Sequence, residues 1–385
     1  MNHINSNTNP CSSCGLCAVS CSQNAITIEH DENGFYRPTV NERICTDCGI
    51  CSKVCYKFLD EKTAFENTFQ NKSVYAAWSK DRNTVLTSSS GGISHELISY
   101  YGNAGYKICG VIFDAPNDVC KHIIAESRED IEAIKTSKYL QSYTVEAFSQ
   151  FNKNEKHVVA GTPCQIYGLH QWIKFKKWED NFILVDFFCH GTPSFNLWRK
   201  NKEYICKEFQ LDSRWKSVSF RKKTSELKWR SYATSIEDSF GKKFEKNKAF
   251  PGNLFPKFFL NNSCLNEACD RCKLRLDNCA SDIRLGDFWG PKYSSNEEGV
   301  SLVIINTSKG EKVLEEIADR LVIEKCTFED LELSQPVRYL SMHPKQMIIL
   351  EELKGNKPLN IIYDKYFKQS FLKKGLLSIK RKLLK

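Results

Sequence analysis

Residues 157–193, "HVVAGTPCQIYGLHQWIKFKKWEDNFILVDFFCHGTP", decide the fold of this chain. The apolar run "HVVA" leads through a Gly-Thr-Pro turn into "IYGLHQWI" (166–173), whose apolar side chains have helical spacing. A second apolar run that ends in a turn, "FILVDFFCHGTP" (182–193), follows. This order is typical of α/β proteins, in which loops gather at the carboxyl edge of a parallel sheet. The stretch therefore predicts a largely parallel sheet with a site at that edge.

The residues around this stretch fit the same architecture. The expected elements are a strand "VYAAW" (74–78), a loop "SSSGG" (88–92), a helix "ISHELISYY" (93–101) and a buried strand "YKICGVIFD" (106–114). That order is a β-loop-α-β unit. Between Lys216 and Lys248 the alternating segments predict a small antiparallel hairpin or sheet. The fold class is therefore α/β in this body, and α+β overall.

Two cysteine runs with identical spacing precede the body. "CSSCGLCAVSC" and "CTDCGICSKVC" have the spacing C-x2-C-x2-C-x3-C of bacterial two-cluster ferredoxins. In such a run three thiolates bind one 4Fe-4S cube and the fourth reaches the other cube. One cluster is therefore expected on Cys11, Cys14, Cys17 and Cys55, and the other on Cys45, Cys48, Cys51 and Cys21. Zinc knuckles and disulfides explain two unbroken runs of four poorly.

Two further features of these runs concern the local backbone. Gly15 and Gly49 let the chain wrap closely around the sulfurs. The proline that commonly follows the fourth cysteine is replaced by Ser22 in one run and Tyr56 in the other. The replacement leaves the ligands intact and affects only the turn.

A third cysteine set is dispersed through the body. Cys164 and Cys189 each end a predicted strand, so in a parallel sheet they emerge at the same edge, and a returning loop can bring Cys269 and Cys272 to them. These four thiols are candidates for a third 4Fe-4S cluster. Buried free cysteines are the alternative, and Cys264 and Cys279 are rival ligands that would complete a zinc site with Cys269 and Cys272. The remaining Cys109, Cys120, Cys206 and Cys326 are expected to be packing residues.

Charge and hydropathy limit the function classes. The net charge is +9, but seven Lys or Arg lie in residues 366–385, so the body lacks the basic surface of a nucleic-acid-binding protein. No stretch reaches the roughly 18–20 apolar residues of a membrane span, and the first residues lack the apolar core of a secretory signal. Eighteen cysteines in such a chain indicate metal or redox chemistry. We therefore expect a soluble, cytoplasmic protein.

Seven stretches, taken in order, resemble the coenzyme F420 hydrogenase/dehydrogenase beta-subunit family. They are "SSSGGISHELISYYGNAGYKICGVIFD", "KYLQS" (138–142), "GTPCQIYGL" (161–169), "CHGTPS" (189–194), "CLNEACDRCK" (264–273), "SDIRLGDFWG" (281–290) and "GVSLVIINTSKG" (299–310). The resemblance implies a ferredoxin domain over residues 1–60, an FAD and iron-sulfur domain over 73–325, and a C-terminal helical region with a basic tail over 326–385.

The resemblance also implies where the cofactors bind. Cys164, Cys189, Cys269 and Cys272 become the ligands of the third cluster, and Cys264 and Cys279 become second choices. By itself "SSSGG" fits either an ordinary helix cap or a phosphate site; the resemblance makes it part of an FAD pocket. The implied flavin contacts are Ser88, Ser89, Ser90, Gly91, Gly92, Lys138, Gln141, Thr162 and Gln165, and Lys138 is placed to stabilise a reduced flavin. Valine at Gly91 and Gly92 is expected to block phosphate approach.

The functional expectation is an iron-sulfur flavoprotein oxidoreductase. Clusters exchange single electrons and a flavin exchanges one or two, so the pair connects an external redox protein to a small-molecule substrate, coenzyme F420 or another compound. The alternative is an electron-transfer subunit that docks on a separate catalytic partner. A zinc-stabilised interaction protein explains fewer of the motifs. No catalytic residue is assigned: His190 is either a proton relay or a loop residue, and "FRKKTSELKWR" (220–230) either lines a route for an acidic substrate or forms a solvated hairpin.

The C-terminal tail is the last feature that the sequence singles out. Residues 366–385 combine an apolar helical stripe with seven basic residues, an arrangement found in helices that lie on anionic membranes. The ferredoxin unit of the same chain and an acidic redox partner are the other candidate partners, and an ordinary terminal helix that packs on its own body is the alternative to all three. A contact with a membrane surface is therefore one of several expectations for the tail.

Overall fold

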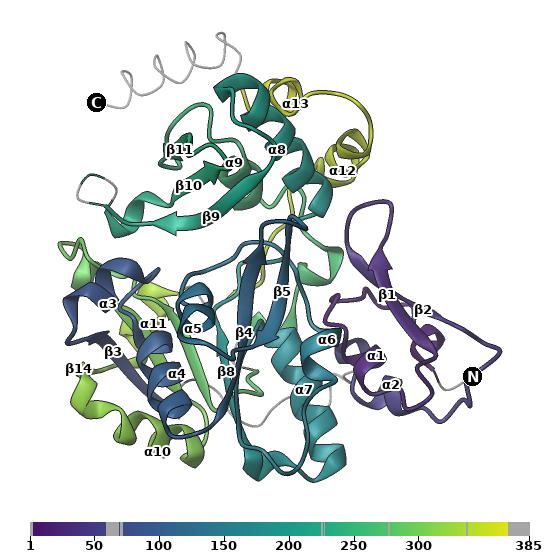
Figure 1. Ribbon diagram of the computed structural model, residues 1–385, viewed down its shortest axis with the longest axis vertical. Coiled ribbons are helices and arrows are strands. Elements are labelled where there is room, and N and C mark those ends of the chain that lie inside the picture. The colour runs from purple at the N-terminus through teal and green to yellow at the C-terminus, as the bar shows by residue number, and fades with distance from the viewer. Residues whose placement is uncertain are drawn as a thin grey trace.

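The computed structural model describes residues 3–58, 69, 72–224, 226, 228–275, 278–335 and 338–368. Figure 1 shows three parts: the ferredoxin unit (residues 3–58, purple), a body built on a large sheet, and a second lobe above the body that is formed by residues 195–260 and 338–368. The expected basic C-terminal helix falls on residues 369–385, which lie outside the described residues.

The ferredoxin unit has the repeated architecture that its two cysteine runs predict. Its elements are α1 (Leu16–Val19), β1 (Ile26–His30), β2 (Tyr36–Val40), α2 (Ile50–Lys53) and the 3-10 helix η2 (Tyr56–Phe58). Gly15 and Gly49 precede α1 and α2 with φ values of 80° and 73°. Glycine adopts this left-handed conformation without steric cost, which explains why both runs carry one at this position.

The body is a nine-stranded sheet in the order β14-β3-β13-β12-β8-β7-β4-β5-β6. Its strands are β3 (Ser73–Ser79), β4 (Lys107–Asp114), β5 (Val119–Ile124), β6 (Ser142–Tyr143), β7 (His157–Ala160), β8 (Phe182–Phe187), β12 (Ile283–Asp287), β13 (Ser301–Ile305) and β14 (Leu321–Cys326). Only the centre, β12-β8-β7-β4, and the edge pair β5-β6 are parallel. The other neighbours are antiparallel.

The expectation of a largely parallel sheet is therefore wrong for its two flanks. The turn between β4 and β5 sends the chain straight back, with Asp118 at a φ of 58°, and a short turn of this kind can join only antiparallel strands. The predicted β-loop-α-β unit has its elements in the expected order, but its two strands are not neighbours in the sheet, because four strands separate β3 from β4.

Helices cover both faces of the sheet. They are α3 (Arg82–Thr87), α4 (Ile93–Asn103), α5 (Arg128–Ile134), α6 (Val145–Phe148), α7 (Pro163–Lys176), α10 (Ser308–Glu316) and α11 (Phe328–Ser334). Leu97 of α4 and Val313 of α10 pack against Val158 and Val303 of the sheet, whereas Leu169 of α7 packs in a separate cluster. This two-sided covering explains the nearly continuous apolar runs of the central strands.

The second lobe contains the small antiparallel sheet that the sequence predicts. Its elements are α8 (Phe195–Phe209), β9 (Trp215–Lys222), β10 (Ala233–Asp238), β11 (Lys243–Lys246), α9 (Phe255–Leu260), α12 (Gln346–Lys354) and α13 (Leu359–Phe367). The sheet order is β11-β10-β9. Trp198, Phe258, Ile349 and Ile362 belong to one buried cluster, so the C-terminal helices share a core with residues of α8 and α9 that lie far earlier in the chain.

The ferredoxin unit is packed firmly on the body. Leu16 of α1 is fully buried in a cluster with Ile166 and Leu169 of α7. A Cβ atom at Gly168 would come within 2.9 Å of Leu16 Cγ, so the glycine in α7 permits this close approach. Thr144 adds a hydrogen bond from its Oγ1 to the carbonyl oxygen of Cys14, at 2.8 Å.

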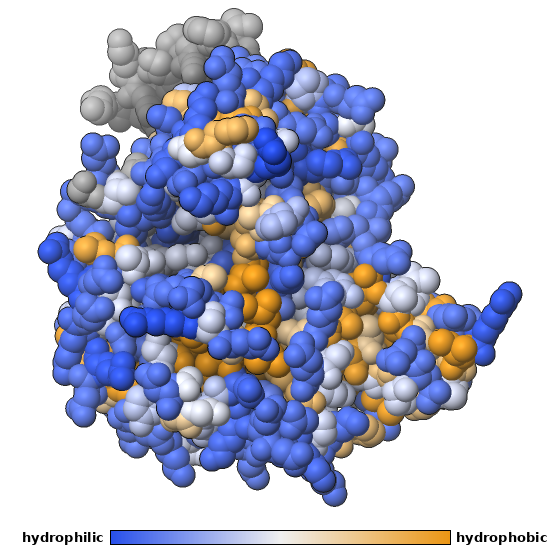
Figure 2. Space-filling model, in the orientation of Figure 1, coloured by the Kyte–Doolittle hydropathy of each residue, from blue (hydrophilic) through white to orange (hydrophobic). Residues whose placement is uncertain are grey.

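The surface in Figure 2 is mostly polar on this face, with apolar side chains gathered near its middle. None of the helices in the described part of the chain combines the length and the apolar character that crossing a bilayer requires.

Candidate functional site

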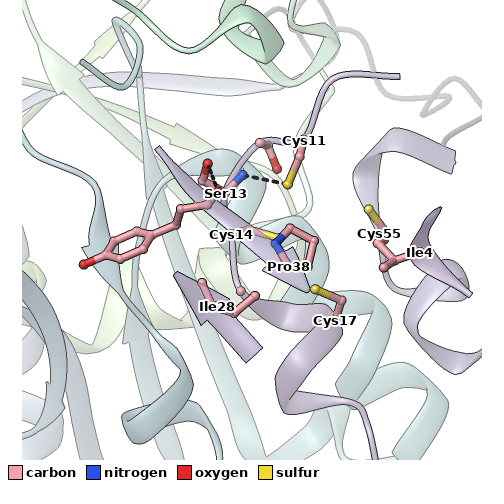
Figure 3. Close-up of a pocket in the computed structure, with 11 residues that line it drawn as sticks. Ile4, Cys11, Ser13, Cys14, Cys17, Ile28, Pro38 and Cys55 are labelled. Atoms are coloured by element: carbon pink, nitrogen blue, oxygen red, sulfur yellow. Dashed lines mark hydrogen bonds between the residues drawn. The ribbon is translucent and has the colours of Figure 1, made fainter. Parts of the chain in front are cut away.

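The first thiol set forms around a pocket in the ferredoxin unit. Figure 3 shows the pocket, and Cys11, Cys14, Cys17 and Cys55 are among the residues that line it. Burial raises the pKa of Cys14 to about 12, and the neighbouring thiols of Cys55 and Cys11 contribute to the rise. The fourth cysteine of the second run thus lies with three cysteines of the first run, which is the crossed arrangement that the spacing predicts.

The second thiol set lies in the same unit. Burial raises the pKa of Cys51, and the thiol of Cys21 contributes to the rise, so these two expected partners are neighbours. Cys45 is half-buried and Cys48 is exposed, so this set is open to solvent on one side.

The third thiol set lies where the body meets the ferredoxin unit. Because β7 and β8 are parallel neighbours, Cys164 at the start of α7 and Cys189 after β8 emerge at one edge, as expected. Burial raises the pKa of Cys269, and the thiols of Cys189, Cys272 and Cys164 add to the rise. The structure thus brings together the four dispersed cysteines.

Polar groups support these four thiols. Cys269 Sγ accepts the backbone N–H of Thr192 at 3.4 Å, and the Thr162 hydroxyl lies 3.2 Å from Cys164 Sγ. Burial and the thiol of Cys272 raise the pKa of Cys189 to about 11, while Arg275 and Arg284 favour its thiolate. Four thiols with two nearby guanidinium groups fit a negatively charged 4Fe-4S cluster.

The two rival cysteines have different surroundings. Cys264 is fully buried next to Ser194, whereas Cys279 packs in a cluster with Phe288 and, like Cys272, contributes to the raised pKa of Arg284. Among the described residues, no three His, Cys, Asp or Glu side chains converge closely enough to hold a single metal ion. This finding gives no support to the zinc alternative, because a zinc site needs four side chains around one metal atom. The ligands of a 4Fe-4S cube bind four different iron atoms and therefore lie farther apart. Cys109, Cys120, Cys206 and Cys326 belong to hydrophobic clusters.

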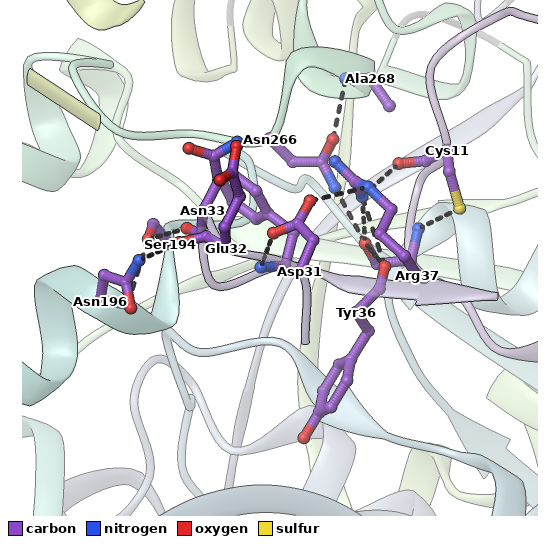
Figure 4. A network of polar contacts seen from close by, with 12 residues as sticks. Cys11, Asp31, Glu32, Asn33, Tyr36, Arg37, Ser194, Asn196, Asn266 and Ala268 are labelled. Carbon is purple, nitrogen blue, oxygen red and sulfur yellow. Dashed lines mark hydrogen bonds and ion pairs between the residues drawn. The ribbon is translucent and has the colours of Figure 1, made fainter. Parts of the chain in front are cut away.

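The first and third thiol sets adjoin each other. The thiol of Cys164 lies 3.9 Å from the carbonyl oxygen of Ser12, in the loop between Cys11 and Cys14, and the thiol of Cys14 contributes to the raised pKa of Cys164. The polar network in Figure 4 fixes the same loop, since Asn266 donates to Ser13 Oγ at 3.0 Å and Arg37 donates to the carbonyl of Cys11 at 3.1 Å.

The turn Ser88–Gly92 connects α3 and α4. Ser89 Oγ accepts the N–H of Ser137 at 2.9 Å, which joins this turn to the segment that contains "KYLQS". The N–H of Gly91 donates to Ser301 Oγ at 3.0 Å, so it is not a free donor for a phosphate. A Cβ at Gly91 would come within 2.5 Å of the carbonyl oxygen of Ala77. Valine there would disturb the sheet as well as any ligand, so the substitution does not isolate cofactor binding.

Other groups at this turn fit an anionic ligand. Ser88 Oγ is buried and has no hydrogen-bond partner in the described part of the chain. Lys223 donates to the carbonyl oxygens of Ser90 and Val85 at 2.7 Å and 2.8 Å, and burial lowers its pKa to about 7. Lys138 donates to the carbonyl of Ala133, and burial also lowers its pKa to about 7. A nearby phosphate would stabilise both cations.

The remaining three predicted flavin contacts lie near the ferredoxin unit. Gln141 donates to the carbonyl oxygen of Ser13 at 3.0 Å. Thr162 and Gln165 form a capping box at the start of α7, and Gln165 also donates to Ser142 Oγ at 3.0 Å. Their polar groups therefore serve the helix start and the contact between the two parts of the chain.

An aromatic pocket was not predicted from the sequence. It is lined by Tyr139, Phe220, Tyr232, Thr234, Phe255, Pro256, Phe259 and Leu260. Phe259 lies 4.8 Å from the ring of His190, which follows Cys189, and Tyr139 follows Lys138. The pocket thus adjoins the residue that follows Cys189 of the third thiol set. Its residues come from three separate segments of the chain. The only signal in the sequence is the high aromatic content of these segments, which does not indicate that they meet.

An ion pair joins the second lobe to the sheet beside this pocket. Arg221 donates to Asp287 Oδ2 at 2.6 Å, and the indole of Trp229 donates to Asp287 Oδ1 at 3.0 Å. Trp289 stacks on Trp229 at 4.7 Å and on Tyr232 at 5.6 Å. Arg221 and Trp229 of the segment 220–230 are therefore built into the interior of the protein and do not lie on a solvated hairpin face.

Comparisons with known proteins match two parts of the chain. Residues 154–330 match the family model for the C-terminal part of the coenzyme F420 hydrogenase/dehydrogenase beta subunit, and residues 10–57 match a 4Fe-4S dicluster domain. No curated protein sequence matches the chain. Among solved structures, a chain of the F420-reducing [NiFe] hydrogenase complex from Methanosarcina barkeri is 17% identical. That match has a TM-score of 0.46 and covers 75% of this chain and 90% of the other.

Proposed function

Because this chain joins a 4Fe-4S dicluster domain to the C-terminal domain of the coenzyme F420 hydrogenase/dehydrogenase beta-subunit family, we propose that it is an iron-sulfur flavoprotein oxidoreductase. It would exchange electrons between an external redox protein and a small molecule, coenzyme F420 or another compound, at a flavin. The observation that carries the proposal is the contact between the first and third thiol sets across the interface of the two domains.

The residues have distinct roles in this proposal. Bound clusters supply one-electron exchange, and bound FAD supplies both one- and two-electron exchange. Cys164, Cys189, Cys269 and Cys272 would hold the third cluster. Lys138 and Lys223, at the Ser88–Gly92 turn, would pair with the FAD phosphates. The aromatic side chains beside Tyr139 would adjoin the flavin ring on the side of His190.

Metal analysis tests the number of clusters. The anaerobically purified chain is expected to contain about twelve irons and negligible zinc, since three sets of four cysteines are available and each 4Fe-4S cluster needs four. About eight irons would contradict the third cluster. Zinc near one equivalent would instead support the set that includes Cys264 and Cys279.

The pH dependence of FAD binding tests the role of the two lysines. Each has a pKa of about 7, so each is protonated below that pH and neutral above it. FAD affinity is expected to fall as pH rises through 7, by up to about tenfold per pH unit for each lysine that must carry a proton. The flavin-free chain should show the opposite trend in stability, because above pH 7 the unfolded chain retains protons that the folded chain has lost.

Fluorescence titration of the flavin-free, cluster-loaded chain with FAD at a series of pH values measures this dependence. Lys223→Gln, which can still donate to Ser90 and Val85, should bind FAD more weakly and with a shallower pH dependence. Lys80→Gln is a matched control, because that lysine is exposed and contacts the carbonyl of Asp319. An affinity that is constant over this range would contradict the proposed phosphate site.

The alternative function, an electron-transfer subunit of a larger complex, also has an observation in its favour. Met347 and Ile348 on α12 and Ile361 on α13 are 72%, 55% and 50% exposed, an apolar surface that a partner protein would cover. The reduced isolated chain separates the two functions. Reoxidation by coenzyme F420 or another small molecule supports the enzyme, whereas reoxidation only by redox proteins supports the subunit.

We also propose that the basic C-terminal tail contacts an anionic membrane surface. Tyr363 and Phe367 pack against Phe258, so a truncation after Lys368 keeps the core of the second lobe and removes only residues 369–385. The full chain is expected to bind anionic vesicles at low salt, and the truncated chain to lose binding at unchanged thermal stability. Lower stability of the truncated chain, with no vesicle binding by the full chain, would contradict this contact.

We also propose that the protein is cytoplasmic. Twelve of the eighteen cysteines belong to the three sets proposed as cluster ligands, and a reducing compartment keeps such thiols available for iron.

A further inference from the structure

Tyr56 occupies an unusual position at the interface of the two domains. It directly follows Cys55 of the first thiol set, and its hydroxyl accepts the backbone N–H of Lys273 at 2.8 Å. Lys273 in turn directly follows Cys272 of the third thiol set. One side chain therefore joins the residue next to a ligand of one set to the residue next to a ligand of the other.

The ring of Tyr56 is also held in place. It meets the ring of Tyr167 edge to face, at 6.0 Å and 82°. Tyr167 lies on α7, one turn after Cys164. The ring contact and the hydrogen bond thus reach the two segments that present Cys164 and Cys272.

The two cysteine runs differ at this position. Bacterial ferredoxins commonly carry proline after the fourth cysteine, and proline has neither a hydroxyl nor an aromatic ring. Ser22, at the matching place in the other run, is exposed and points to no thiol set outside its own unit. Of the two residues that replace proline, Tyr56 is therefore the one that contacts the body, and it follows the cysteine that belongs to the first thiol set.

From these contacts we infer that Tyr56 is a positioning residue that fixes the separation and orientation of the first and third clusters, and so the rate of electron transfer between the two domains. This inference rests on the proposed third cluster. Tyr56 itself undergoes no redox change. Its hydroxyl orients the segment Cys272–Lys273, and its ring fills the space beside α7.

Tyr56→Phe tests the hydroxyl and Tyr56→Leu tests the ring. Both variants are expected to retain about twelve irons, because no ligand changes. In the fully reduced chain, the dipolar splitting between the first and third clusters, measured by electron paramagnetic resonance, should change. Stopped-flow transfer from the ferredoxin unit to the third cluster should slow by roughly tenfold, since small displacements of redox partners have large effects on rate.

Tyr143→Phe is the matched control, because Tyr143 lies at the same interface against Tyr36 and away from the thiols of the third set. It should leave both the splitting and the rate unchanged. Unchanged splitting and rate in both Tyr56 variants would overturn the inference and leave the proposed function standing. An unmodified chain with only about eight irons would overturn both the inference about Tyr56 and the proposed function. Metal analysis of the unmodified chain distinguishes this outcome from a failure of the inference alone.

Discussion

Replacing Cys164 by alanine is expected to lower the iron content from about twelve to about eight per chain, because one 4Fe-4S cluster loses a ligand. The effect should be confined to the third cluster, since the ligands of the other two lie within the ferredoxin unit. Reduction of the flavin by a one-electron donor should become too slow to measure on the timescale of the unmodified chain. Iron analysis and stopped-flow spectroscopy at the flavin absorption band measure the two effects.

Cys264→Ala is the matched control for this experiment. Cys264 is a buried thiol in the segment that carries Cys269 and Cys272, but it lies next to Ser194 and not among the four thiols. Its substitution should lower stability through a small cavity and leave about twelve irons in place. If Cys264→Ala lost four irons and Cys164→Ala did not, the ligand assignment would be wrong.

Replacing Arg284 by methionine is expected to lower the free energy of unfolding by about 3–5 kcal/mol, because it leaves a buried carboxylate without its partner. Arg284 on β12 and Asp186 on β8 are register partners, joined by hydrogen bonds of 2.8 Å and 2.6 Å. Both side chains are 1% exposed. Urea denaturation followed by circular dichroism measures the loss.

Two further variants separate the pair from its surroundings. Arg284→Met combined with Asp186→Leu removes both charges, so most of the lost stability should return. Arg82→Met breaks a pair with Glu298 of similar geometry whose side chains are 76% and 40% exposed, and it should have little effect on stability. Equal losses in Arg82→Met and Arg284→Met would show that burial does not control the cost.

The features that the sequence predicts well are those set by local spacing. The two cysteine runs place four thiols within a few residues, so their grouping depends little on the rest of the chain. Cys164 and Cys189 were also predictable together, because each ends an apolar run and adjacent parallel strands end at one edge. Cys269 and Cys272 needed a long return loop that no local pattern specifies.

The features that the sequence does not predict depend on distant partners. The N–H of Gly91 donates to Ser301, 210 residues later, and nothing in the sequence of the turn indicates this partner. The sequence alone is therefore compatible with a free phosphate-binding loop. Arg221 and Asp287 are 66 residues apart, and neither neighbouring sequence indicates that they pair. One antiparallel flank has a similar cause, since the pairing of β13 with β3 joins strands that lie far apart in the chain, whereas β4 and β5 of the other flank are joined by a local turn.

The contact of Leu16 with Gly168 has a kinetic consequence. A ferredoxin that diffuses must find its acceptor anew for each electron, so delivery slows on dilution. Here the glycine admits the leucine so closely that the ferredoxin unit stays docked on the body, and the two units meet at an effective concentration that dilution leaves unchanged. In the proposed function, electron exchange within the chain is thus a first-order process, and only exchange with an external redox protein depends on protein concentration.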